Sequence, residues 1–218
     1  MIGRWLKTIG ATLPLLLVYW LILWPGLLAR DQMTTGQFLT YLMIWVILFI
    51  VSLPLLLSGL IRRFWFFPGN GEPVAPELLQ SLLLSVNEMH AGPVRARKKR
   101  KTIVVSWRCE KGLWCERMEQ LGLKRLFELK LRFDPATRTV IVSGRTRSVD
   151  LSLCPVKVKQ GWLSFPRPFF GIRLGSDWGF AIYRQTRPED YSFTPGELLN
   201  PVVNEILRNG WNIRLSVL

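Results

Sequence analysis

The chain has 218 residues, of which 49% are hydrophobic and 20% charged, and its formal net charge is +14 at pH 7. This length allows a pair of membrane helices and one modest globular domain. The 3 cysteines are too few and too scattered for a disulfide framework, so we expect free thiols, as in a reducing cytoplasm. Most of the positive excess lies beside two apolar segments and in one basic run, so net charge alone does not indicate nucleic-acid binding.

Two long apolar segments, residues 8–29 and 32–61, fill most of the first quarter of the chain. Apart from Arg30 and Asp31, residues 8–61 contain no Asp, Glu, Lys, Arg or His. Each segment is longer than the roughly 20 residues that an α-helix needs to cross a bilayer. Residues 1–67 are therefore predicted to form an anchor of two transmembrane helices, arranged as a hairpin.

Cations flank the two outer ends of this hairpin, whereas its turn has one Arg beside one Asp. Lys and Arg beside membrane spans stay preferentially on the cytoplasmic side, so we expect a multi-pass protein of a bacterial-type inner membrane with both termini cytoplasmic. A cleaved signal peptide is disfavoured, because the apolar core is longer than usual and no cleavage site is evident before Arg30. The predicted membrane-interface anchors are Arg4, Lys7, Arg62, Arg63 and Trp65.

Residues 68–93 are predicted to be a linker followed by an amphipathic helix. Residues 68–73 are rich in Pro and Gly, which break regular structure. Pro76 suits the first turn of a helix, and apolar residues at helical spacing follow it. Because the polar face lacks the Lys and Arg of a membrane-surface helix, we expect this helix to pack on protein.

A dense basic run follows that helix. Its cations are the predicted contacts for anionic lipid or phosphate: Arg95, Arg97, Lys98, Lys99, Arg100 and Lys101. Polybasic segments near a membrane bind anionic headgroups, and the same cations could bind a nucleotide or nucleic acid. The run lacks the interleaved aromatic residues that single-strand recognition uses. In the remaining interpretation the cations bind no ligand. They keep this segment on the cytoplasmic side of the membrane and are otherwise solvated at the end of a strand.

Residues 94–218 are predicted to form a soluble, β-rich α+β domain. Apolar residues alternate with polar ones in residues 102–107 and 127–133, then again in 140–142 and 149–153, as in half-buried strands. A further hairpin is expected over residues 170–183. A capping box at Thr194 and Glu197 predicts a helix that ends near Gly210, before a final strand. We expect a mostly antiparallel, barrel-like sheet.

No pattern in the chain predicts a catalytic, metal or cofactor site. The only histidine, His90, lies at a predicted helix end, where a cation is favourable. Glu128 and Lys130 match the Glu-x-Lys of metal-dependent nucleases, but no acidic ligand precedes them on the neighbouring strand, and alternating surface charges give the same tripeptide. The candidate anion-ligand face consists of Arg145, Arg147, Arg173, Arg184 and Trp178.

Two functions are consistent with these features. The first is a non-enzymatic membrane protein whose cytoplasmic domain recruits or assembles with a partner, as a homo-oligomer or as a subunit of a membrane complex. The second follows from layout. The chain resembles bacterial antiphage effectors that couple two membrane helices to a small β-barrel. That resemblance implies that the barrel senses a cyclic nucleotide and drives oligomerisation and membrane disruption.

Overall fold

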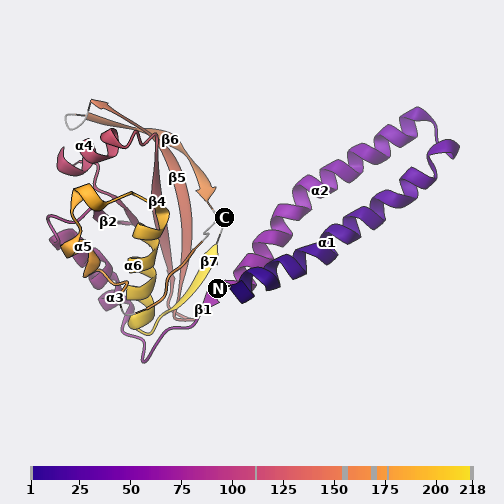
Figure 1. Cartoon of the computed structure of the whole chain (residues 1–218). Coiled ribbons are helices and arrows are strands. Elements are labelled where there is room, and N and C mark those ends of the chain that lie inside the picture. Colours follow the sequence, from indigo (N-terminus) through magenta and orange to yellow (C-terminus); the bar gives the residue numbers. More distant parts are fainter. Residues whose placement is uncertain (1, 111, 154–156, 168–170, 176, 217–218) are drawn as a thin grey trace. The chain divides into compact units, whose positions relative to one another are not determined.

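The computed structural model describes residues 2–110, 112–153, 157–167, 171–175 and 177–216. The chain divides into two compact units, one ending at Trp65 and the other beginning at Phe66. The first unit consists of two long helices, and the second is an α+β domain (Figure 1). The predicted linker and amphipathic helix, residues 68–93, lie within the second unit.

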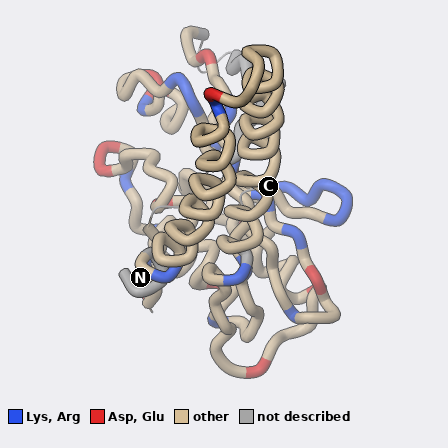
Figure 2. Tube along the Cα trace, turned by 90° about the vertical axis from the view of Figure 1, so that its right-hand side faces the viewer, with Lys and Arg blue, Asp and Glu red and all other residues tan. Residues whose placement is uncertain are grey.

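The first unit pairs α1 (Ile2–Leu28) with α2 (Thr35–Phe64), joined by the short 3₁₀ helix η1 (Arg30–Gln32). Both helices are long and apolar enough to cross a membrane, which confirms the prediction of two long apolar helices. Only 11% and 6% of the residues in their most apolar stretches are buried. The core helix of a soluble protein would be mostly buried, so these helices differ from one. Figure 2 shows charged residues at the ends of the pair and none between them.

Polar side chains and a glycine hold α1 and α2 together. The Tyr19 and Ser52 hydroxyls are hydrogen-bonded to each other, and the Trp45 indole N–H donates to the Tyr19 carbonyl at 3.0 Å. The Tyr41 ring lies where a side chain at Gly26 would otherwise be, so only glycine fits there. At the start of α2, Thr34 and Gln37 form a capping box.

The second unit is built on a seven-stranded, mostly antiparallel sheet. Six strands follow the order β1-β7-β5-β4-β3-β2, and β6 pairs with the second half of β5, beyond the reach of β7. Only the β5–β7 pairing is parallel. The strands are β1 (Phe66–Phe67), β2 (Val94–Lys99), β3 (Thr102–Trp107), β4 (Arg125–Asp134), β5 (Thr139–Leu153), β6 (Lys157–Arg167) and β7 (Asn212–Ser216).

Helices cover one face of this sheet (Figure 1). Alternate strand residues such as Val105, Leu129 and Val142 are fully buried beneath them, because successive side chains of a strand point to opposite faces. The helical elements of this unit are α3 (Pro76–Leu84), η2 (Ser85–Glu88), α4 (Gly112–Gln120), α5 (Ile182–Gln185), η3 (Pro188–Asp190) and α6 (Pro195–Arg208). On strands β2, β3, β4 and β5, the polar residues that alternate with these buried ones point to the opposite face of the sheet. That face forms the site described below.

The sheet is open, so the predicted barrel is wrong. Among the described strands, β1 and β2 end the order and do not pair with each other. The outer edge of β2 is occupied by side chains instead of a strand. The Asn87 amide both donates to the carbonyl of Ala96, at 2.8 Å, and accepts from its N–H, at 3.0 Å. A covered edge strand with surface cations resists further strand pairing.

Two other local predictions fail, and one helix was missed. Residues 171–175 and 177–183 form no hairpin, because the buried α6 side chains of Asn200 and Asn204 hydrogen-bond the backbone of Arg173 and Gly175 in place of a partner strand. Phe170 lies outside the described residues. Helix α4 was not anticipated from the sequence. Cys115 is disulfide-bonded, contrary to the expectation of free thiols, whereas Cys109 is a buried thiol that donates to the Trp107 carbonyl at 3.5 Å.

Candidate anion-binding groove

A hollow of about 730 Å³ lies on the sheet face that the helices leave open. We call it the groove. It is lined by residues of β2, β3, β4 and β5 and by the turn between β2 and β3. Eight of its lining residues are cations: Arg95, Arg97, Lys99, Arg100, Lys101, Lys130, Arg145 and Arg147. Glu128 is its acidic lining residue among those described.

Short side chains on β3 form the floor of the groove. Thr102, Val104 and Ser106 point to this face, while Ile103, Val105 and Trp107 between them are buried in the core. The strand register sets longer side chains on either side of this floor. Val104 pairs with Arg97 of β2 and with Lys130 of β4.

Two ion pairs hold arginines at the rim of the groove. Arg147 Nη2 lies 3.2 Å from Glu128 Oε1, and Arg95 Nη1 pairs with Glu110. Burial lowers the pKa of Arg95, and the Glu110 carboxylate opposes that shift. By contrast, Arg97, Lys99 and Lys130 form no ion pair with any described residue.

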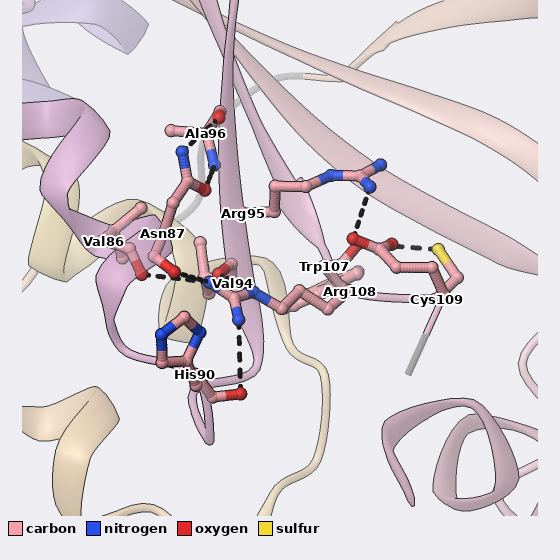
Figure 3. A network of polar contacts seen from close by, with 10 residues as sticks. Val86, Asn87, His90, Val94, Arg95, Ala96, Trp107, Arg108 and Cys109 are labelled. Atoms are coloured by element: carbon pink, nitrogen blue, oxygen red, sulfur yellow. Dashed lines mark hydrogen bonds and ion pairs between the residues drawn. The ribbon is translucent and has the colours of Figure 1, made fainter. Parts of the chain in front are cut away.

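Buried Arg108 anchors the β2 wall of the groove to the preceding turn (Figure 3). Its guanidinium donates to four backbone carbonyls: Val94 at 2.8 Å, Asn87 at 2.9 Å, Val86 at 3.1 Å and His90 at 3.3 Å. Burial lowers its pKa, but an arginine stays charged at physiological pH. Arg108 thus ties the end of η2 to β2 while the Asn87 side chain holds Ala96.

The groove unites two sets of predicted anion contacts that are far apart in sequence. Arg95, Arg97, Lys99, Arg100 and Lys101 of the basic run lie beside Arg145 and Arg147 of β5. Lys98 lies between Arg97 and Lys99 on β2, so its side chain points to the other face of the sheet. It lines a second hollow of about 460 Å³.

The other predicted members of the anion face do not line the groove. The Arg173 guanidinium lies over the Trp178 ring, 5.1 Å from its centroid, and Arg184 is exposed on α5. These three residues are therefore separate from the groove-lining cations.

The predicted membrane-interface residues belong to the first unit. Lys7 and Arg63 are exposed, whereas Trp65 is buried, and its indole N–H donates to the Thr8 hydroxyl at 3.3 Å. The side chains of Arg4 and Arg62 lie outside the described part of the structure.

Sequence reasoning did not assign Lys130 or Ser106 to an anion site. The available signal was strand phase: Glu128 and Lys130 fall on the polar side of an alternating segment, as Arg95 and Arg97 do in the basic run. The comparisons with known proteins supply no further assignment. No family model, curated protein or solved structure matches this chain.

Proposed function

We propose that this protein is a membrane-anchored, non-enzymatic recruitment factor. The helices α1 and α2 hold it in a bilayer, and the groove of the second unit binds an anionic partner. The observation that carries the proposal is a strongly basic groove in the same chain as two long, exposed apolar helices. Charged surfaces of this kind steer and select oppositely charged partners.

We further propose that both termini are cytoplasmic. Cations adjoin the free ends of the two helices, including Lys7 and Arg63, while the η1 turn carries Arg30 next to Asp31. This asymmetry follows the positive-inside pattern. The disulfide at Cys115 opposes this orientation, because disulfides are typical of oxidising compartments. An exposed cysteine introduced in the β4–β5 turn, Ala136→Cys, tests the orientation: with both termini cytoplasmic, a membrane-impermeant maleimide should label it in lysed cells and not in intact cells.

Binding, and not catalysis, is the proposed task of the groove. Its polar lining consists of cations, the Glu128 carboxylate, the buried Cys109 thiol and hydroxyl groups on Thr102, Ser106 and Ser148. Its lining carboxylate, Glu128, is in an ion pair with Arg147. Cations and hydroxyls in this arrangement hold an anion but do not make an acid–base pair.

Site-specific cross-linking in cells tests the recruitment proposal. A photoreactive residue on the floor, Val104→p-benzoylphenylalanine, should yield a discrete product in the membrane fraction. Charge reversal by Arg97→Glu with Lys130→Glu should abolish that product. The matched control is Leu113→p-benzoylphenylalanine on exposed α4, which should not give the same product. Recovery of the protein in the soluble fraction, or equal products from both positions, would refute the proposal.

A cyclic-nucleotide sensor is the second candidate, and the size of the groove favours it. A volume of about 730 Å³ is within the usual range of small-molecule sites, about 300–1,000 Å³. The sensor would bind the phosphates of its ligand through Arg145 and Arg147 and then cluster its helix pairs. Thermal stabilisation of the full-length chain by a cyclic dinucleotide, lost on Arg145→Ala, would distinguish this function from recruitment.

A further inference from the structure

Cationic side chains line both sides of the groove. Its floor runs along β3, with Arg97 and Lys99 of β2 on one side and Lys130 of β4 on the other. Neighbouring strands are about 4.8 Å apart, so the β2 and β4 backbones lie about 10 Å apart across the floor. Long side chains from both walls can therefore reach one compact anion above Val104.

Few carboxylates of the protein neutralise the cations of the groove. The lining contains eight cations against one described carboxylate, Glu128. Glu110 pairs with Arg95 from outside the lining, but Arg97, Lys99 and Lys130 have no ionic partner among the described residues. Like charges held this close repel one another, and a multivalent anion relieves that repulsion.

Unsatisfied hydrogen-bond donors on both sides of the groove are a second observation. The Nε groups of Arg95 and Arg147 are buried without an acceptor in the described structure, as is that of Arg117, which does not line the groove. Buried donors are nearly always paired, so each exception calls for a missing acceptor. A phosphate that draws either guanidinium toward the groove would supply one, because phosphate accepts from the Nε and Nη groups of arginine together.

The lining does not provide a platform for bases. Phe127 is its aromatic residue among those described, and this ring is only 2% exposed because it belongs to the core. Proteins that bind single-stranded nucleic acids stack the bases on exposed aromatic rings. The groove is therefore suited to phosphate groups and not to bases.

We propose that the groove binds a ligand through two or more phosphate groups held close together, such as an oligophosphate or a multiply phosphorylated lipid headgroup. The inference rests on the proposed function in using the groove as the recognition surface, and it names the chemistry of the ligand. Arg97, Lys99 and Lys130 bind the phosphates from the two walls, and Thr102 and Ser106 on the floor donate hydroxyl hydrogen bonds.

The first test uses the full-length chain in phosphatidylcholine nanodiscs, with inorganic tripolyphosphate as the probe. Calorimetry should show tripolyphosphate binding at least about tenfold more tightly than orthophosphate, since each added charged contact strengthens binding. Arg97→Gln or Lys130→Gln should weaken binding about tenfold, the expected loss of one such contact. The matched control is Lys98→Gln, which removes a neighbouring cation from outside the groove and should leave the affinity unchanged.

A flotation assay distinguishes the two sources of phosphate. The chain is kept in phosphatidylcholine nanodiscs, so that α1 and α2 do not insert into the vesicles. It is then floated with phosphatidylcholine vesicles that carry either phosphatidylinositol bisphosphate or phosphatidylserine at equal total charge. Preference for the bisphosphate vesicles, removed by Lys130→Gln, identifies a lipid headgroup. Tripolyphosphate binding without vesicle preference identifies a soluble oligophosphate.

Three results would overturn the inference. They are no binding of either phosphate probe, equal weakening by Lys98→Gln, and tighter binding of a cyclic dinucleotide than of tripolyphosphate. If cross-linking from Val104 still captures a partner in a groove-dependent way while the phosphate probes fail, the recruitment function stands and only the ligand chemistry is wrong.

Discussion

Replacing Arg108 with methionine should destabilise the second unit strongly. Arg108 is 4% exposed, and its guanidinium donates to four backbone carbonyls. Its hydrogen bonds to Val86 and Val94 are fully buried, whereas those to Asn87 and His90 are nearer to solvent. An unpaired buried acceptor costs about 1–3 kcal/mol. In Arg108→Met the buried carbonyls of Val86 and Val94 lose their donor, while those of Asn87 and His90 can bind water instead. We therefore expect the free energy of unfolding to fall by about 3–4 kcal/mol.

Thermal unfolding of the full-length chain in detergent measures this loss. For a unit of this size, about 1 kcal/mol corresponds to a Tm shift of roughly 2–4 °C. We therefore expect Tm to fall by roughly 6–16 °C, with hydrogen exchange increasing first in residues 86–96. Arg108→Lys keeps the charge but cannot reach all four carbonyls, so it should give an intermediate loss.

Arg97→Met is the matched control for the loss of an arginine. Arg97 is exposed and makes no ion pair with the described residues, so its replacement should change stability by less than about 0.5 kcal/mol. If Arg108→Met shifts Tm no more than Arg97→Met does, the carbonyl cluster contributes little. The account of how β2 is fixed to η2 would then be wrong.

Other predictions concern the aromatic core, the α6 cap and a tight turn. Burial raises the pKa of Tyr183 well above the ordinary tyrosine value of 10.0. The stability linked to the neutral hydroxyl is therefore complete below about pH 10 and is lost as the pH rises above it, so Tyr183→Phe should flatten the alkaline limb of a Tm–pH profile. Glu197→Ala removes the carboxylate that accepts from the Thr194 N–H at 2.8 Å, and should cost about 1 kcal/mol in urea unfolding. Gly210 has φ +74° and a Cβ there would overlap the Glu72 backbone, so Gly210→Ala should cost more than about 2 kcal/mol. Gly122→Ala, at φ +62° in open space, should cost only about 1 kcal/mol.

Local signals predicted several elements of the second unit well. Pro76 does occupy the first turn of α3, and the Thr194–Glu197 capping box does begin α6. The helix continues through Pro201 without interruption. The alternation of residues 127–133 and the turn after Asp134 correspond to the β4–β5 hairpin. Such features depend on neighbouring residues, so a single sequence contains the necessary information.

Predictions that depended on distant partners were less successful. The segment around Arg173 alternates like a strand, but its hydrogen-bonding partners are amides on α6, some thirty residues further along the chain. Closure of the sheet was also misjudged, because Asn87 and Arg108 occupy the edge of β2. Neither side chain carries a local signal of that role.

The sequence by itself determined the two long apolar helices, the flanking cations and the phase of most strands, because these follow from composition and from short-range periodicity. Only the tertiary structure brought the basic run beside Lys130, Arg145 and Arg147 around a floor of short β3 side chains. The pairing register of β2, β3, β4 and β5 decides which cations share a face and how far apart they lie. Apolar alternation and short turns set the register within the β2–β3 and β4–β5 hairpins. The pairing of β3 with β4, which α4 separates along the chain, is decided only when the domain folds.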